Sequence, residues 1–361
     1  MKSLTDFFQG FSNSPLKQAV VGIDIGSSSI KLVQLESQKG VVTLTTYGEI
    51  QLGPYANSDV GQSIVLNAKQ EQEALVDVLR ESAVVAKNAV FAMPLTSSFV
   101  TNALVEADPK ADISALVRVE ARKVIPISLN EVTLDWAEMN LEEKETKKES
   151  VKREVLIAAI QNSALERFRT LMQFVGLTVP PTEIECFSAI RALHTEGYED
   201  MVIVDIGATT TKLYIAKKGL LMRMHRIRVG GATATSRIAS VLNIQFEAAE
   251  IKKREVQKTD ADYSDIKRAH DTSFDRAFRE LNQVLQQYEE KTNLKLKNVY
   301  LTGGATLFPG IELLLRDILN REVAHTNAFA KVSYPAFMHD TIKDIAPSFT
   351  VALGAALRTF E

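Results

Sequence analysis

The sequence has little cysteine and no long apolar run. Its 361 residues include one cysteine, Cys186, which excludes a disulfide bond within the chain and favours a reducing, cytoplasmic setting. No apolar stretch approaches the roughly 20 residues of a membrane-spanning helix, and the N-terminus lacks the long apolar core of a secretory signal. The formal net charge is −3, so charge gives no reason to expect a nucleic-acid partner.

A short motif occurs twice. Residues 24–31 read Asp-Ile-Gly-Ser-Ser-Ser-Ile-Lys, and residues 205–212 read Asp-Ile-Gly-Ala-Thr-Thr-Thr-Lys. In each copy the Asp ends an apolar, strand-like run, and a second such run resumes after the Lys. Because the two copies open the two halves of the chain, we interpret them as the product of a duplication. A ligand shared between the halves is expected, and we predict that it is a nucleotide.

The small residues of each turn suit a phosphate. Glycine lets the backbone approach a ligand closely, and successive N–H groups of such a turn form a concavity that binds phosphate oxygens. Neither turn matches G-x-x-x-x-G-K-[ST] or G-x-G-x-x-G, and each joins strand to strand. An ordinary hairpin is the alternative for either copy alone. The predicted contacts are Gly26, Ser27, Ser28 and Ser29 in the first copy and Gly207, Ala208 and Thr209 in the second.

Charged residues flank both turns. Asp24 and Asp205 stand at strand ends, where facing carboxylates suit a hydrated Mg²⁺ held on a nucleotide. Capping of their own turns is the alternative. The ammonium group of Lys31 can reach back towards the phosphates and act on them as a point charge. Lys212 has the same spacing, and either lysine is equally compatible with a solvated position, so we rank Lys212 second.

Two later motifs fit the rest of a nucleotide. Gly303 and Gly304 follow a strand and precede a helix, where flat backbone can lie against a purine or a phosphate. Gly230 and Gly231 precede another helix. Glu250 and Lys253 are three residues apart on a predicted helix, so they face the same way and can grip ribose and base. A routine surface salt bridge is the alternative for that pair.

Strands and helices alternate in two matching halves, which predicts an α/β architecture. Residues 142–153 are almost wholly charged with mixed signs, which predicts a solvated hairpin loop. The predicted parts are an N-terminal segment 1–18, a first half 19–94 with 176–200, an inserted α+β module 95–175, and a second half 201–361 with a helical subdomain 245–295. The predicted helices span 72–86, 112–124, 164–175, 232–242, 246–257, 264–292, 309–320 and 347–359.

These motifs, in this order, resemble those of the actin, Hsp70 and sugar-kinase superfamily. In its terms residues 21–35 and 202–215 look like the two phosphate motifs and 301–311 like the adenosine motif. Residues 183–193 and 350–357 look like the two connecting helices. The resemblance implies a duplicated actin-like ATPase fold, and it covers nearly the whole chain except the inserted module.

The position and the local sequence of the insertion restrict the resemblance to fewer families within the superfamily. An insertion in the first half is shared by the cell-division protein FtsA and the PilM family of type IV pilus assembly proteins. Residues 92–94 (Ala-Met-Pro), 120–126 (Glu-Ala-Arg-Lys-Val-Ile-Pro) and 131–136 (Glu-Val-Thr-Leu-Asp-Trp) are closer to PilM. The chain also stops directly after its last predicted helix, without the amphipathic tail typical of FtsA.

The PilM resemblance implies a cytoplasmic, ATP-binding scaffold peripheral to the inner membrane. The implied partners are the cytoplasmic N-terminal tail of PilN, bound between the first-half core and the inserted module, and components of the pilus motor or ring. Ser27–Ser29 and Gly207–Thr209 would hold phosphates, with Asp24 and Asp205 near Mg²⁺. Glu185 matches the position at which relatives orient an attacking water, or is a capping residue. The implied nucleoside contacts are Gly230, Gly231, Glu250, Lys253, Gly303 and Gly304.

Two other functions remain open at this point. A small-molecule kinase or a polyphosphate hydrolase would need a carboxylate base at a substrate pocket, and no acidic site of that kind stands apart from the nucleotide motifs. The second open function is that of an FtsA-like filament protein of cell division. For the scaffold we expect ATP turnover to be slow or absent.

Overall fold

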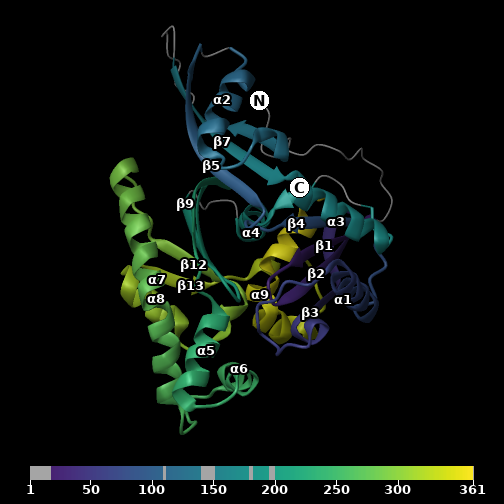
Figure 1. Cartoon of the computed structure of the whole chain (residues 1–361), viewed down its shortest axis with the longest axis vertical. Helices are drawn as coiled ribbons and strands as arrows, with labels where there is room; N and C mark the ends of the chain where they lie inside the picture. The colour runs from purple at the N-terminus through teal and green to yellow at the C-terminus, as the bar shows by residue number, and fades with distance from the viewer. Residues whose placement is uncertain (1–17, 109–110, 140–150, 179–181, 195–199, 361) are drawn as a thin grey trace.

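The structure is a computed structural model that describes residues 18–108, 111–139, 151–178, 182–194 and 200–360 (Figure 1). The predicted N-terminal segment, apart from Gln18, lies outside these ranges. So does the predicted charged loop up to residue 150, whereas its last three residues already belong to a strand. Among the described helices, none combines the length and the apolar character needed to cross a membrane.

The first half is built on a five-stranded sheet in the order β3-β2-β1-β4-β8. The β1–β2 and β2–β3 pairs are antiparallel, and the β1–β4 and β4–β8 pairs are parallel. Apolar side chains of the central strands are fully buried, as expected for a sheet covered on both faces. The strands are β1 (Gln18–Ile25), β2 (Ser29–Gln38), β3 (Val41–Gln51), β4 (Asn88–Met93) and β8 (Glu183–Ile184).

The second half repeats this sheet. Its order is β11-β10-β9-β12-β13, again with two antiparallel pairs followed by two parallel pairs. The duplicated α/β fold class is therefore confirmed. The strands are β9 (Asp200–Ile206), β10 (Thr211–Lys217), β11 (Leu220–Ile227), β12 (Asn298–Thr302) and β13 (Glu322–His325). The short strand β13 was not predicted, because its side chains are mostly exposed and leave no apolar pattern.

A third, antiparallel sheet interrupts the first half. Its order is β5-β7-β6, from β5 (Ser98–Ala107), β6 (Val132–Glu138) and β7 (Val151–Gln161). The helices α2 (Ser114–Val124) and α3 (Asn162–Phe174) accompany it, with a 3-10 turn, η3 (Leu129–Glu131). Figure 1 shows this sheet projecting beyond the two larger ones. The helix α3 returns to the first sheet, where Phe168 stacks on Phe91 of β4 with ring centroids 4.2 Å apart.

Helices cover both large sheets. In the first half these are α1 (Ala68–Glu81) and α4 (Glu185–Leu193); in the second they are α5 (Gly231–Leu242), α6 (Phe246–Glu255), α7 (Tyr263–Thr292) and α8 (Ile311–Leu319). The helix α9 (His339–Leu357) comes last among the described helices. Short 3-10 turns are η2 (Gly53–Ala56), η4 (Gly304–Leu307), η5 (Ala328–Lys331) and η6 (Ala336–Met338).

Two predicted helix starts are wrong. The helix α1 begins four residues before the predicted residue 72, because Asn67 and Gln70 form a capping box upstream of the apolar stripe. The helix α9 begins at His339, eight residues before the predicted start at Pro347. Proline is typical of a first helical turn, but here it lies inside the helix. Its carbonyl accepts bonds from Gly303 N–H at 2.8 Å and Thr302 Oγ1 at 2.9 Å, which ties α9 to the second half.

The helix α9 also packs tightly on the first half. A Cβ atom added at Gly22 of β1 would lie 2.0 Å from the carbonyl oxygen of Ala352, so glycine is required for this close approach. A Cβ atom at Gly354 would lie 1.8 Å from the carbonyl oxygen of Ser188 on α4. The helix therefore contacts the first sheet and α4 while it holds a loop of the second sheet.

Candidate functional site

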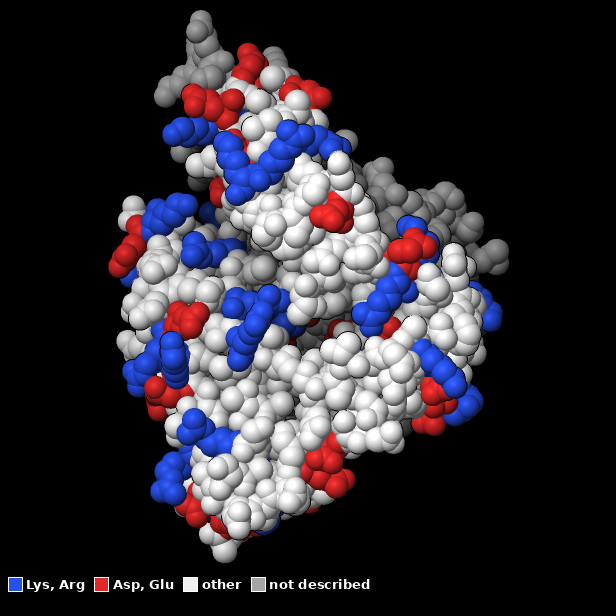
Figure 2. All heavy atoms as spheres, in the orientation of Figure 1, with Lys and Arg blue, Asp and Glu red and all other residues white. Residues whose placement is uncertain are grey.

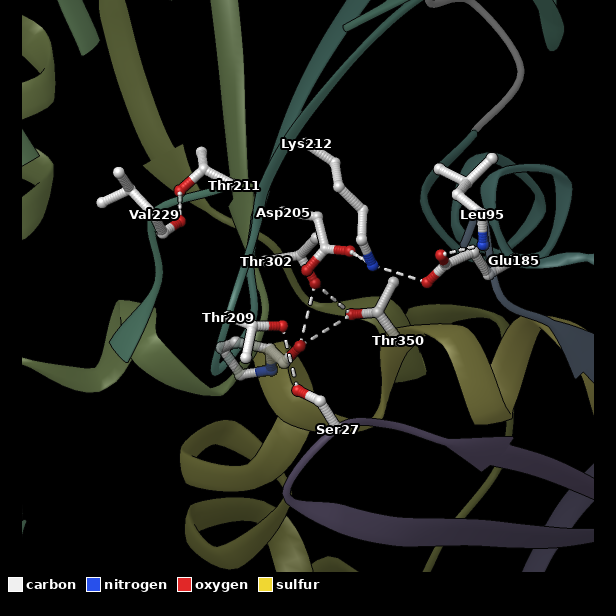
Figure 3. Close-up of polar contacts among 11 residues, drawn as sticks. Ser27, Leu95, Glu185, Asp205, Thr209, Thr211, Lys212, Val229, Thr302 and Thr350 are labelled. Atoms are coloured by element: carbon white, nitrogen blue, oxygen red, sulfur yellow. Dashed lines mark hydrogen bonds and ion pairs between the residues drawn. The ribbon is translucent and has the colours of Figure 1, made fainter. Parts of the chain in front are cut away.

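The two repeated motifs form matching hairpin turns. Gly26 N–H donates to the Ser29 carbonyl at 3.0 Å, and Gly207 N–H donates to the Thr210 carbonyl at 2.9 Å. In each hairpin the Asp pairs directly across the strands with the Lys of the same motif. The turns meet tip to tip, because Ser27 Oγ lies 3.1 Å from Thr209 Oγ1 (Figure 3).

A cavity of about 860 Å³ surrounds these tips and is lined by both halves. Every residue predicted for the site lines this cavity except Gly230. Figure 2 shows a hollow at the centre of the molecule, with acidic atoms inside it and basic side chains on its rim. The helix α3 of the inserted module also reaches the cavity through Arg167 and Phe168. Residues far apart in the sequence are thus brought to one concave site of the size expected for a ligand.

A buried ion cluster lies on one wall. Lys212 donates to Glu185 Oε2 at 2.5 Å and to Asp205 Oδ2 at 3.1 Å (Figure 3). The other oxygen of Glu185 accepts the Leu95 N–H at 2.7 Å. Burial lowers the pKa of Lys212, but the two carboxylates outweigh it and hold that pKa well above its ordinary value. Although ranked second from the sequence, Lys212 lies at the centre of the charged wall.

Asp24 carries negative charge that its surroundings compensate incompletely. Burial raises its pKa, Lys31 and Lys212 lower it, and Glu185 and Asp205 raise it; the result is a pKa of about 6. The carboxylate is therefore held close to other carboxylates in a site where its charge is unfavourable. A cation in this part of the cavity would offset the repulsion between Asp24 and the neighbouring carboxylates.

Lys31 is already engaged within the first half. Its ammonium donates to Ser29 Oγ at 2.6 Å and lies 3.1 Å from Glu49 Oε1. Glu49 is its direct cross-strand neighbour on β3. Burial raises the pKa of Glu49, but Lys31 and the hydroxyl of Ser29 outweigh it and hold that pKa below its ordinary value.

Glycine residues allow neighbouring backbone segments to pack closely against the second hairpin. Gly231 N–H donates to the Gly207 carbonyl at 2.9 Å, so the start of α5 rests on the turn. Gly230 lies behind this wall: a Cβ atom there would lie 2.5 Å from the Gly207 carbonyl oxygen, so Gly230 provides space rather than a cavity surface. Gly303 has φ +93°, and a Cβ atom on it would lie 2.5 Å from Asp205 Oδ1.

The Glu250 and Lys253 pair is not a surface salt bridge. Glu250 is only 4 % exposed, and its carboxylate accepts from Lys253 Nζ at 2.6 Å, Thr235 Oγ1 at 2.5 Å and Arg254 Nε at 2.6 Å. Burial raises the pKa of Glu250, but the ammonium of Lys253 and these hydrogen bonds hold it below its ordinary value. A Cβ atom on Gly61, which has φ +84°, would lie 2.7 Å from the carboxyl carbon of Glu250. The first half thus contacts the second on this side of the cavity.

The donors present suit a hydrated divalent cation better than a directly ligated one. Among the described residues no group of three or more His, Cys, Asp or Glu side chains is arranged to hold a metal ion directly. Mg²⁺ usually keeps several waters and is held by one or two carboxylates together with phosphate oxygens. The uncompensated charge of Asp24, with Asp205 on the opposite hairpin, matches that mode.

Some cavity residues have no signal in the repeat. Arg226 lies on β11 and Arg228 just beyond its end, four and two residues before the predicted Gly230, and both line the cavity. Their spacing on a strand that follows the repeated hairpin could have indicated them. Thr302, whose hydroxyl donates to the Pro347 carbonyl, also lines the cavity.

The two matching sheets, with facing hairpins between them and a helix that joins the halves, define an actin-like fold. A family model described as type IV pilus assembly protein PilM matches residues 22–360. The chain therefore belongs to the PilM family of type IV pilus assembly proteins.

Solved structures share this fold. A structure of the PilM–PilN type IV pilus biogenesis complex is 24 % identical with a TM-score of 0.80, over 95 % of this chain and 98 % of that chain. EutJ, an ethanolamine utilization protein from Carboxydothermus hydrogenoformans, is 16 % identical with a TM-score of 0.55, over 98 % and 92 %. MreB5 of Spiroplasma citri bound to ADP is 12 % identical with a TM-score of 0.50, over 91 % and 98 %.

Proposed function

We propose that the chain is an ATP-binding scaffold of the type IV pilus machinery. The observation that carries this proposal is the pair of equivalent hairpins that meet at 3.1 Å across the cavity. Each offers backbone N–H groups and hydroxyls to one space, which is the chemistry of a phosphate cradle. Nucleotide binding would stabilise the contact between the halves, because phosphates touch both tips at once.

The rest of the cavity divides between metal and nucleoside. Asp24 and Asp205 would hold Mg²⁺ through its waters, and the ion would neutralise phosphate charge. Glu250 and Lys253 would face the ribose and base, while the backbone at Gly303 permits flat approach of the purine. Gly304 and Gly231 complete this wall.

Hydrolysis is expected to be slow or absent. A general base for water needs a carboxylate oxygen that is free to take a proton. Both oxygens of Glu185 are occupied, by the Leu95 N–H and by the ammonium of Lys212. In this arrangement Glu185 positions Lys212 instead of activating water, so the bound nucleotide acts chiefly as a conformational ligand.

The second ligand we propose is the cytoplasmic N-terminal tail of PilN, bound between the first-half core and the inserted module. Two contacts lie at that boundary. Arg167 of α3 donates to both oxygens of Glu71 on α1, at 2.6 and 3.0 Å, and Phe168 stacks on Phe91. Since α3 also lines the cavity, nucleotide and peptide sites would share one helix. Binding to PilN would keep the scaffold at the inner membrane and link it to motor or ring components.

Calorimetry with Mg·ATP tests the proposed nucleotide site, and calorimetry with a peptide of the PilN tail tests the proposed peptide site. We expect nucleotide binding that Asp205→Ala weakens by about 2–4 kcal/mol, because the substitution removes a charge opposed to the ion. Asp317→Ala, an exposed carboxylate on α8, is the matched control and should leave binding unchanged. Peptide binding that is absent with and without nucleotide would refute the scaffold role. Unchanged nucleotide affinity in Asp205→Ala would refute the placement of the ion.

The two other functions considered from the sequence are not favoured. Membership of the PilM family argues against an FtsA-like division protein. A kinase or polyphosphate hydrolase would need a free carboxylate base beside its substrate, and Glu185 and Asp205 are paired with Lys212.

A further inference from the structure

The duplication places three charged side chains in one row across each large sheet. In the first half, Asp24 of β1 pairs with Lys31 of β2, which pairs with Glu49 of β3. The equivalent row in the second half starts at Asp205 of β9 and passes through Lys212 of β10. Its third member, on β11, is Arg226. The third position is therefore acidic in one half and basic in the other.

This exchange changes the charge balance of the two rows. The first row holds two carboxylates and one ammonium, and its lysine is neutralised by its own neighbour, Glu49, at 3.1 Å. In the second row Lys212 finds its partners in Asp205 and in Glu185 of the other half. Arg226 is left with a cationic neighbour and no acidic one in the row.

Arg226 has no partner among the described residues. Its Nη1 atom is buried without a hydrogen bond, although the residue as a whole is only half-buried and lines the cavity. Buried donors of this kind are rare, and each needs an explanation such as a bound water, an ion or a ligand. Among the basic residues that line the cavity, those with a bonded partner are Lys31, Arg167, Lys212, Lys253 and Arg254. Arg226 and Arg228 are the two for which the described part of the chain supplies none.

We infer that Arg226, with Arg228 beside it, forms an anion subsite for a phosphate group next to the second hairpin. Arg228 is two residues further along the chain, just beyond the end of β11 and towards the hairpin turn. A guanidinium donates two parallel hydrogen bonds to phosphate oxygens, which an ammonium cannot reproduce. The phosphate is either the terminal group of a bound triphosphate or free inorganic phosphate.

The subsite would give the cleft a preference for triphosphate over diphosphate. A diphosphate satisfies the hairpins but leaves Arg226 without an anion. This inference rests on the proposed nucleotide function, since it assigns the terminal group of the same ligand. A charge-assisted hydrogen bond is commonly worth a factor of about ten or more in affinity. Arg226 is therefore a specificity residue of the cleft.

The test compares wild type with Arg226→Gln, Arg226→Lys and Arg228→Gln. Calorimetry in Mg²⁺ would measure the dissociation constants of a non-hydrolysable ATP analogue, of ADP, and of ADP with added inorganic phosphate. Arg223→Gln is the matched control, because Arg223 lies on the same strand but is exposed and outside the cavity lining. Since the Arg226 side chain has no hydrogen bond or ion pair within the described chain, Arg226→Gln should fold like wild type, and thermal unfolding would check this.

We expect Arg226→Gln to lose at least about tenfold in affinity for the triphosphate while ADP affinity stays unchanged. Arg226→Lys should recover only part of the loss. A loss confined to the triphosphate assigns the subsite to the attached terminal phosphate. Loss of a phosphate-dependent gain in ADP affinity assigns it to the free ion.

Equal losses for triphosphate and ADP would overturn the inference. So would an unchanged triphosphate affinity together with an unchanged effect of added phosphate on ADP binding. If wild type binds no nucleotide at all, the proposed function fails. In that case titration with inorganic phosphate alone still decides the subsite: binding by wild type that Arg226→Gln abolishes supports it, and equal binding or none refutes it.

Discussion

Asp24→Asn should stabilise the nucleotide-free protein at neutral pH. The carboxylate has a pKa of about 6, against 3.8 in the unfolded chain. A pKa raised by folding means that the folded state binds the proton more tightly than the unfolded state. The stabilising contribution is therefore complete below pH 3.8 and is lost as the pH rises to about 6. Above that value, the ionised carboxylate destabilises the fold.

The size of this effect follows from the shift. A difference of about two pKa units corresponds to about 3 kcal/mol of unfolding free energy. An amide has the same shape and no charge, so Asp24→Asn removes the pH-dependent penalty. At pH 7.5 the variant should be more stable than wild type by up to about 3 kcal/mol, and near pH 4 the two should converge.

Urea unfolding in EDTA, without nucleotide, would measure this at pH 4, 5, 6 and 7.5. The informative quantity is the difference between variant and wild type at each pH, because other groups titrate in both. Asp317→Asn, which removes an exposed charge on α8, is the control and should show no such trend. If Asp24→Asn is less stable than wild type at pH 7.5, or if the difference does not vary with pH, the unfavourable charge assigned to Asp24 is incorrect.

The same variant should bind Mg·nucleotide more weakly, since the group that destabilises the empty site is the one that favours the cation.

Two further substitutions test other parts of the cavity. Lys212→Met leaves Asp205 and a second buried carboxylate without their cation, so we expect a loss of about 3–5 kcal/mol in chemical unfolding; a loss below 1 kcal/mol would show that water reaches them. Gly61→Ala places a Cβ atom 2.7 Å from the carboxyl carbon of Glu250, which should force the halves apart there and raise the nucleotide dissociation rate about tenfold, measured by stopped-flow release of a fluorescent analogue. An unchanged rate would show that the loop around Gly61 does not close on the nucleotide.

Much of the site could be predicted because its signal is local. In a hairpin the turn fixes the register, so an Asp before and a Lys after the turn must face each other. This is why each of the 24–31 and 205–212 motifs indicated a hairpin and their repetition indicated a shared site, although the Asp–Lys pairing itself was not predicted. The burial of Glu250 was missed because it depends on residues that are distant in the sequence. Whether a helical pair is solvated depends on what packs above it, here α5 and the loop around Gly61, which lie far away in the sequence.

The roles of individual lysines could not be read from spacing. Lys31 and Lys212 occupy equivalent positions, yet one pairs with its neighbour on β3 and the other with Glu185 of the opposite half. That difference comes from the third strand of each sheet, which carries an acid in one half and Arg226 in the other. The start of α9 was missed because Pro347 resembles a first-turn residue until the bonds to its carbonyl are known.

The position of α9 has a consequence for how the protein is made. This helix is the last described one in the chain, yet it lies against β1, the first described strand, closely enough to require Gly22. While the ribosome is still synthesising the second half, the apolar face of the first sheet lacks the helix that covers it. Contacts between residues so far apart form late and leave a growing chain open to aggregation. The first half is thus translated first but completed last, and the nascent chain would depend on chaperones until residues 339–357 emerge.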